Sequence, residues 1–298
     1  MLRMRIYCCL LAFLFLCAPA KSASFDDDAD GATPAFTQVP ELMEAFHLLY
    51  GQHFTEARAR FSAWESQNPK EPFGEVAVAA SYLFEEFYRQ GVLTSDFFLN
   101  EKRFLKGIEG APDPMRMKEF QKALDRARAL AKDRLGKKTS DPEALFALTL
   151  SAGMESNADM VLKKQRLDSL KRLKEANEYA KQLLAQRPDA NDAYVALGSA
   201  NYIIGSLSGG ARFMLWFGGI HGDKKLGMEQ LGKTADGGRY LCEFAKILLA
   251  LAARREKKNA LAQKLLRELT AEFPDSSLFA AEYAKAMGRP VPAIMKPN

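Results

Sequence analysis

The feature that most constrains the fold is a four-point spacing that occurs three times. It is first seen in Ala57, Phe61, Trp64 and Pro69, which stand at offsets 0, 4, 7 and 12. Two further segments repeat these offsets: Ala176, Ala180, Leu183 and Pro188, and Ala262, Leu266, Leu269 and Pro274. Apolar residues three and four apart lie on one face of a helix, and proline cannot continue a helix. The spacing therefore predicts three copies of one amphipathic helix, each ended by a proline.

Weaker copies extend the pattern to five repeats. They lie at Ala123, Ala127 and Leu130, and at Gly227, Leu231 and Thr234. The five small residues that head the copies, Ala57, Ala123, Ala176, Gly227 and Ala262, are separated by 66, 53, 51 and 35 residues. Beyond Pro40 the dominant period is helical and strand-like alternation is absent. The sequence therefore predicts one all-α repeat domain over residues 40–288, with extra residues inserted in its earlier intervals.

The signature resembles the second helix of a tetratricopeptide repeat (TPR), in which a small residue packs against the partner helix and proline ends the helix. Residues 51–57 are similar to the family's turn into that helix, and Ala250, Tyr194, Leu197 and Gly198 match positions of its first helix. The resemblance implies a right-handed superhelix of about ten to twelve helices with a concave groove lined by the first helices. Five residues at or just past the ends of predicted first helices are the groove candidates: Tyr82, Glu86, Asn157, Asn201 and Tyr202.

Three insertions account for the long intervals. The first covers residues 92–114, and the second lengthens the helix before Ala176 with a basic stretch between Lys163 and Lys174. A solvated helix face and a contact with an anionic partner or lipid surface are both open for that stretch. The third insertion covers residues 205–222 and is the least like repeat sequence.

The third insertion carries five consecutive large apolar residues, 213–217, between glycine-rich flanks. Five such residues in a row cannot all face one core. One interpretation is a short helix that covers the concave face or a neighbouring seam. The other is an exposed surface that grips a ligand, a partner or a membrane, because contiguous apolar patches usually mark interaction sites. Its candidate contact residues are Phe213, Trp216, Phe217 and His221.

The N-terminus predicts export. Two arginines in residues 1–5 precede the apolar run 6–17 and the small residues 18–20, which together are typical of a secretory signal peptide over residues 1–20. A retained signal anchor is the alternative. Residues 21–39 are predicted to be a flexible acidic leader, and residues 289–298 a flexible tail. Cleavage would lower the formal net charge from +5 to +3 and leave Cys242 as the single cysteine, which we expect to be buried and inert.

The sequence offers little support for catalysis. Residues 227–234 match the phosphate-loop pattern GxxxxGK[ST], but no buried strand precedes them and they fall on repeat positions, so nucleotide binding is not expected. The three histidines, His47, His53 and His221, have no partners at metal-ligand spacing. We therefore expect no catalytic residue, no metal and no cofactor. The slight, evenly spread charge does not favour a nucleic-acid partner.

These observations predict an exported, non-enzymatic scaffold or binding protein of the cell envelope, most readily of the bacterial periplasm. Residues 194–277 also resemble the periplasmic TPR component associated with TRAP-type transporters, which implies a ligand-handling accessory that binds a solute-binding protein. Gly222, Asp223 and the preceding apolar run are similar to eukaryotic TPR proteins of the inclusion-body-clearance type, which implies membrane association. The alternative function is accordingly a peripheral membrane or lipid-associated protein that uses residues 205–222. The oligomeric state stays open.

Overall fold

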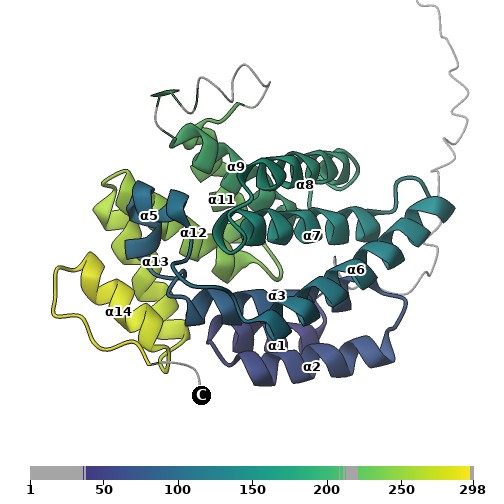
Figure 1. Cartoon of the computed structure of the whole chain (residues 1–298), viewed down its shortest axis with the longest axis horizontal. Coiled ribbons are helices and arrows are strands. Elements are labelled where there is room, and N and C mark those ends of the chain that lie inside the picture. The colour runs from purple at the N-terminus through teal and green to yellow at the C-terminus, as the bar shows by residue number, and fades with distance from the viewer. Residues whose placement is uncertain (1–35, 37, 208, 211, 213–220, 296–298) are drawn as a thin grey trace, which may run out of the picture. The chain divides into compact units, whose positions relative to one another are not determined.

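The structure, a computed structural model, describes residues 36, 38–207, 209–210, 212 and 221–295. Within these residues the chain is helical apart from turns and loops, and no β-strand is present (Figure 1). The predicted signal peptide and residues 213–217 lie outside the described residues. The helices run in the order α1 (Pro40–Tyr50), α2 (Phe54–Gln67), α3 (Pro72–Arg89), α4 (Ser95–Leu99), α5 (Glu101–Lys106), α6 (Pro114–Lys137), α7 (Pro142–Val161), α8 (Arg166–Gln186), α9 (Tyr194–Gly205), α11 (Lys224–Gly237), α12 (Cys242–Arg255), α13 (Asn259–Glu272) and α14 (Ser277–Ala286), with the 3₁₀ turn η2 (Asn191–Ala193) before α9.

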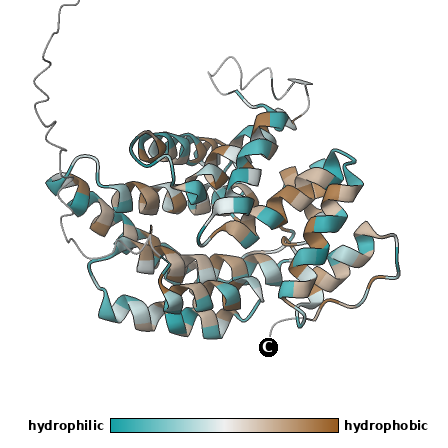
Figure 2. Ribbon diagram, turned by 180° about the vertical axis from the view of Figure 1, so that it is seen from behind, coloured by the Kyte–Doolittle hydropathy of each residue, from teal (hydrophilic) through white to brown (hydrophobic). Residues whose placement is uncertain are grey.

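Consecutive helices pack as hairpins. The pairs are α1 with α2, α3 with α6, α7 with α8, α9 with α11, and α12 with α13, and α14 packs on α13. Neighbouring hairpins also contact each other through their first helices, α3 with α7, α7 with α9, and α9 with α12. This arrangement confirms the predicted fold class, an all-α helical solenoid in which each helix is stabilised by its neighbours along the chain. Figure 2 shows that each long helix carries both apolar and hydrophilic residues, as expected of helices that pack on their neighbours and also face the solvent.

The five small residues that head the repeats lie on the second helices of the five hairpins, and all five are buried. The closest approach is in the α9–α11 hairpin. A Cβ atom on Gly227 would come within 2.5 Å of the Tyr202 amide nitrogen, and one on Gly198 within 2.9 Å of the Leu231 amide nitrogen. Real Cβ contacts are not this short, so these two helices meet at a distance that only glycine permits.

Four of the first helices end in the same way. The residue that follows α1, α3, α7 or α12 by one to three positions adopts a left-handed backbone conformation, with φ between 58° and 68°: Gln52, Gly91, Lys164 and Lys257. A left-handed residue at this place reverses the chain and satisfies the last carbonyls of the helix. In α12, for example, the Lys258 amide donates to the Ala253 carbonyl at 2.8 Å. The turn from first to second helix is thus a repeated element, as the repeat pattern implies.

The three insertions differ in form. The first contains the short helices α4 and α5, which cover a second, smaller core around Phe97 and Phe120. The second extends α8, which begins at Arg166, ten residues ahead of the repeat position Ala176. The third leaves the end of α9 and returns at the start of α11, where Gly222 lies against Gly205: a Cβ on Gly222 would be 2.4 Å from the Gly205 amide nitrogen. Residues 206–221 are therefore an excursion whose two ends meet.

The main core joins the first hairpin to the last. The fully buried side chain of Tyr240, in the turn before α12, packs on Phe46 of α1 and Phe73 of α3, with ring centroids 5.3 and 5.0 Å apart. Tyr50 of α1 donates a hydrogen bond to the Tyr240 carbonyl at 2.8 Å, and the Val39 amide donates to the Tyr240 hydroxyl at 3.1 Å. Residues about 190 positions apart in sequence are thereby held together. Burial raises the pKa of the Tyr240 hydroxyl to about 12.

Asp192 fixes the turn that carries Tyr240. Its buried carboxylate accepts hydrogen bonds from the amides of Arg239, Tyr240 and Leu241 at 3.0 to 3.2 Å. Burial raises the pKa of Asp192, and the three amide donors act in the opposite sense. A carboxylate that satisfies three consecutive backbone amides ties the α8–α9 turn to the α11–α12 turn.

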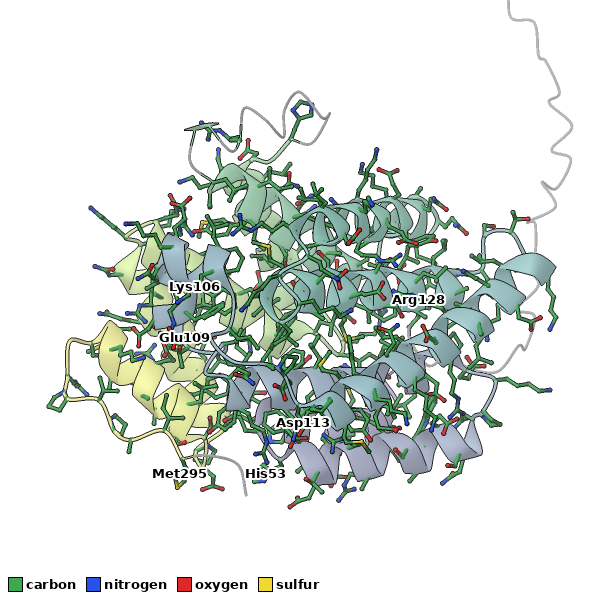
Figure 3. The ribbon with its side chains drawn as sticks, in the orientation of Figure 1. His53, Lys106, Glu109, Asp113, Arg128 and Met295 are labelled. Atoms are coloured by element: carbon green, nitrogen blue, oxygen red, sulfur yellow. The ribbon has the colours of Figure 1, made fainter. Side chains whose placement is uncertain are left out.

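Both predicted flexible ends contribute described residues to the fold. Phe36, within the predicted leader, is buried, and its ring lies 6.0 Å from that of Phe146. At the other end, the Met295 amide donates a hydrogen bond to the Ser277 hydroxyl at 3.0 Å, and the Met295 carbonyl accepts one from the Tyr88 hydroxyl. Figure 3 shows Met295 beside the lower helices. Described contacts to the helices thus begin before α1 and continue past α14.

Candidate functional site

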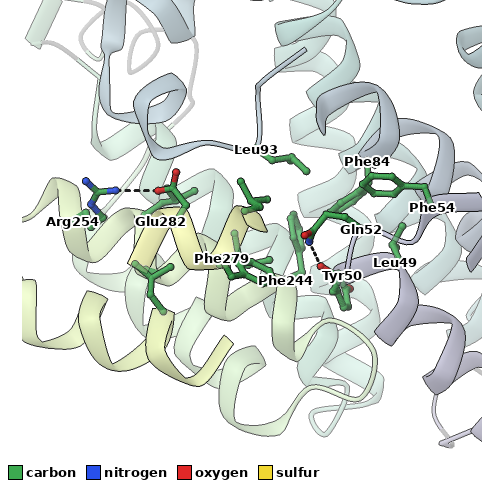
Figure 4. A pocket seen from close by; sticks show the side chains of 15 residues that line it. Leu49, Tyr50, Gln52, Phe54, Phe84, Leu93, Phe244, Arg254, Phe279 and Glu282 are labelled. Atoms are coloured by element: carbon green, nitrogen blue, oxygen red, sulfur yellow. Dashed lines mark hydrogen bonds and ion pairs between the residues drawn. The ribbon is translucent and has the colours of Figure 1, made fainter. Parts of the chain in front are cut away.

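An apolar pocket lies where the two ends of the helical array meet. Its walls come from α1, the start of α2, α3 and the α3–α4 turn on one side, and from α12, α13 and α14 on the other (Figure 4). The lining side chains are almost all apolar, and include Leu49, Phe54, Phe84, Leu93, Phe244, Ile247, Leu251 and Phe279. The pocket thus lies between the first and last hairpins, which the Tyr240 core also joins.

Local packing leaves this space open for identifiable reasons. Phe84 and Phe244 meet edge to face with ring centroids 5.3 Å apart, which holds α3 and α12 one ring apart. Ala250 of α12 also lines the pocket, and its small buried side chain fills little of the space. The cavity volume is about 50 Å³. At about 10–15 Å³ for each water-sized occupant, the pocket has room for a short apolar group rather than a large ligand.

One end of the pocket is charged. Arg254 of α12 donates to Glu282 of α14 at 3.1 Å and to the Ser95 hydroxyl of α4. Lys285 bonds to Glu282 at 3.0 Å and to Asp96 at 2.7 Å. Burial lowers the pKa of Lys285, but the hydrogen bonds that it donates to Asp96 and Glu282 outweigh this and raise it. The four charges balance, so this end fixes α14 and α4 against α12 and leaves the pocket itself without net charge.

The opposite rim is closed by polar contacts to the C-terminal helix and tail. Gln52, the left-handed residue after α1, bonds to the Ser276 hydroxyl and to the Tyr50 carbonyl. Tyr88, which holds the Met295 carbonyl, packs on the lining residue Phe54 with ring centroids 5.6 Å apart. The rim is thus made of the turn after α1 and the segment around α14, which meet through single hydrogen bonds.

The predicted groove residues do not form one site. Tyr82 and Glu86 lie on α3, where Arg58 stacks over the Tyr82 ring at 3.9 Å and the buried Glu86 carboxylate pairs with Arg116 at 2.6 Å. Glu85 joins the same network through Arg58 and Arg116, and although burial acts to raise its pKa, these partners lower it. Glu86 is therefore committed to holding α3 against α6 and offers no free carboxylate to a ligand.

The other three groove candidates lie on α7 and α9. Asn157 is exposed, Asn201 donates to the Gln230 amide oxygen at 2.8 Å, and the Tyr202 hydroxyl lies 3.2 Å from the Ala252 carbonyl and 3.3 Å from Glu256. Burial raises the pKa of Tyr202 to about 12. Asn201 and Tyr202 thus link α9 to α11 and α12, while Asn157 stands apart from both.

Of the residues predicted in the third insertion, Phe213, Trp216 and Phe217 lie outside the described part of the chain. His221 is described and exposed, at the point where the chain returns to α11. The choice between a cover for the array and an exposed surface therefore stays a prediction. The described ends of the insertion place its base at the end of α9 and the start of α11.

The phosphate-loop match lies inside a helix. Residues 227–234 fall within α11, Gly227 is packed against α9, and the Lys233 ammonium sits over the Tyr194 ring at 4.4 Å. The backbone amides that a phosphate would need are therefore helical donors. The match is a consequence of the repeat spacing.

Cys242 and the histidines show no reactive arrangement. The Cys242 thiol is half-buried, and burial beside Glu243 raises its pKa to about 12, so it stays protonated at neutral pH. His47 stacks on Phe273 with ring centroids 4.6 Å apart, and His53 precedes α2. Among the described residues no group of three His, Cys, Asp or Glu side chains could hold a metal ion, and no helix is long and apolar enough to cross a membrane.

Sequence reasoning missed the pocket because its lining residues occupy ordinary apolar positions of separate helices. The one signal that could have marked it is the pair Arg254 and Glu282, charged residues within the apolar faces of α12 and α14. Neither a protein-family model, a curated protein nor a solved structure matches this chain. The TPR and transporter resemblances therefore stay predictions, and the function has to be argued from the site.

Proposed function

We propose that this chain is an exported, non-enzymatic binding protein of the helical-repeat class that holds an apolar group in the pocket between its first and last hairpins. The observation that carries the proposal is the pocket itself, an apolar cavity with walls from both ends of the array. Small cavities lined by aliphatic and aromatic side chains stay dry and bind apolar groups. The occupant would be an apolar part of a larger ligand, or an apolar side chain of a protein partner.

The chemistry of the lining favours binding over catalysis. Its charged residues, Arg254 and Glu282, pair with each other, and Glu282 is also bonded to Lys285. No lining residue is a histidine or cysteine. A cell-envelope location and a transporter-accessory role, with a solute-binding protein as partner, belong to the same proposal and rest on the N-terminal apolar run and the sequence resemblance.

Xenon, an uncharged apolar atom small enough for this cavity, tests the pocket directly. Titration followed by ¹²⁹Xe nuclear magnetic resonance should show saturable binding to the purified protein at a stoichiometry of one. Replacing Leu93, which lies in the α3–α4 turn and lines the pocket, by Trp should fill the cavity and reduce affinity at least tenfold. A second filling variant, Leu251→Trp on α12, should do the same, which guards against a local effect of either one.

The matched control is Leu167→Trp, because Leu167 is 75% exposed on α8 and away from the pocket lining. This variant should bind xenon as the original protein does. Thermal unfolding of all three variants shows whether each is folded. Unchanged affinity in both filling variants, or no saturable binding by the original protein, would rule out the proposed site.

A further inference from the structure

The base of the third insertion carries a cluster of cations that the sequence analysis did not assemble. We call it the basic cluster and define it by its members: Arg212, Lys224, Lys225, Arg255, Lys257 and Lys258. They come from the residues after α9, the start of α11, and the end of α12 with the turn that follows. Two contacts bring these parts together: Arg255 donates to the Ser206 carbonyl at 3.2 Å, and Lys224 donates to Glu256 at 2.9 Å.

The cluster has a surplus of positive charge. Lys224 is its only member in an ion pair with a described residue. Arg212 and Arg255 bond to backbone carbonyls, which leaves their charge in place. Lys225, Lys257 and Lys258 are exposed and have no carboxylate partner within the described chain. The acids nearby in sequence, Asp223 and Glu256, are fewer than the cations, so the surface is net positive.

The basic stretch of α8 provides the contrast. There Lys163 pairs with Asp159 at 2.9 Å, Lys171 with Asp168 at 3.2 Å, and Arg172 with Glu155 at 2.6 Å. Arg128 of α6, labelled in Figure 3, also donates to Glu155. Burial raises the pKa of Glu155, but these arginines outweigh it and lower the pKa. Half of the six cations in that stretch thus have a carboxylate partner in the described chain, against one of six in the basic cluster. The larger surplus of charge therefore belongs to the basic cluster.

Two of the cations sit where helix electrostatics disfavours them. Lys224 and Lys225 are the first residues of α11, and the first turn of a helix carries partial positive charge from its unpaired amides. The Asp223 carboxylate caps this turn and Lys224 pairs with Glu256, which leaves Lys225 as the cation of the turn without an ion pair in the described chain. Lys257 carries a second cost, because it is a non-glycine residue in the left-handed conformation, with φ of 58°. Lys225 and Lys257 gain no ion pair within the described chain that offsets these costs, whereas a contact with an anionic surface would supply one.

The position of the cluster indicates what that surface is. Leu226, beside Lys225, is 43% exposed. Lysine and arginine beside an exposed aliphatic residue are typical of an interfacial membrane contact, since each cation near an anionic leaflet and each buried apolar residue adds to binding.

We infer that the basic cluster is a docking surface for a bilayer containing anionic phospholipid. The inference is independent of the apolar pocket. Helix α12 contributes to both, but no member of the basic cluster lines the pocket. It differs from the alternative drawn from sequence, because the charges that contact the lipid are those of α11 and the α12–α13 turn and not those of α8.

Vesicle co-sedimentation tests the inference with the full chain. Vesicles of phosphatidylcholine with about 30% phosphatidylglycerol are compared with vesicles of phosphatidylcholine alone, so that the two differ in anionic lipid, which attracts basic surfaces. The original protein should bind the anionic vesicles and lose that binding in high salt. The triple variant Lys225→Glu, Lys257→Glu, Lys258→Glu should bind them at least tenfold more weakly.

The matched control reverses three exposed lysines of α8: Lys171→Glu, Lys174→Glu, Lys181→Glu. It has the same net charge as the cluster variant, so a difference between the two reports position and not total charge. Any contribution from residues 1–35 is common to all three proteins. Binding of the cluster variant equal to that of the original protein, equal loss in both triple variants, or equal binding to neutral vesicles would each overturn the inference. Xenon binding in the pocket should be the same in all three proteins.

Discussion

This molecule contains two kinds of helical hairpin. In both kinds the two helices meet in the same kind of seam, but the turns that connect them differ. In α1–α2 and α12–α13 the first helix ends in a left-handed residue and the second begins within two residues of it. In α9–α11 the chain leaves for residues 206–221 before it returns, yet Gly198 and Gly227 bring the two helices as close as backbone contact allows. The seam and the turn are therefore separate determinants of the hairpin. An insertion is tolerated at the turn because the seam alone fixes how the helices pair.

The largest effect is expected from closing the glycine seam. In Gly227→Ala the new methyl group would meet the Tyr202 amide nitrogen at 2.5 Å and the Gly198 carbonyl at 2.8 Å, both of them backbone atoms that cannot move aside. We expect the variant to lose about 2–3 kcal/mol of stability, as overpacked cores do. Urea unfolding followed by circular dichroism measures the loss.

Gly232 on the same helix is the matched control. A Cβ there meets nothing within 4 Å, so Gly232→Ala should stabilise α11 by up to about 1 kcal/mol through helix propensity alone. Opposite signs for the two variants would establish that the seam holds the interrupted hairpin together. If Gly227→Ala were neutral, the turn and the insertion would have to contribute to pairing after all.

This contrast also shows what the sequence could reveal. The hairpins were predictable because the residues that form each seam stand only a few positions apart in the sequence. A small residue, such as Ala57 or Ala262, heads each copy of that spacing. The pocket was not predictable, because Leu49 and Phe279 meet only when the first hairpin reaches the last, through the contacts of Tyr240. Spacing along the chain does not encode that closure. The basic cluster was missed for the same reason, since its cations are separated in sequence by the whole length of α11 and α12.

An intermediate effect is expected at the seam between the first two hairpins, where two glutamates share one arginine. Glu75 of α3 and Glu65 of α2 share Arg126 of α6, at 2.7 and 2.9 Å. Burial raises the pKa of Glu75 from 4.5 to about 7, the charge of Glu65 adds to the rise, and Arg126 opposes it. Between these values the folded protein holds a proton that the unfolded chain releases, so stability should fall as pH rises from about 5 to 7.

Glu75→Gln removes that titration, so its stability should change less than that of the original protein between pH 5 and 8, by on the order of 1 kcal/mol. Urea midpoints at the two pH values measure the difference. Glu44→Gln, at an exposed position on α1, should keep the original pH dependence. A Glu75→Gln profile that ran parallel to the original would mean that the Arg126 pair keeps Glu75 ionised in the folded protein throughout this range.

The smallest effect is expected at a turn, and it links the comparison to the basic cluster. Lys257 and Gly91 occupy the same left-handed place after their helices, with φ of 58° and 67°, but only glycine adopts it without strain. Lys257→Gly should therefore raise stability, by about 0.5 kcal/mol once the greater freedom of the unfolded chain is included. It should also weaken binding to anionic vesicles, because it removes one exposed cation. A gain in stability together with a loss in binding would show that Lys257 lowers the stability of the fold and contributes to vesicle binding. A loss of stability would instead assign Lys257 to the turn itself and leave the cluster with two exposed lysines.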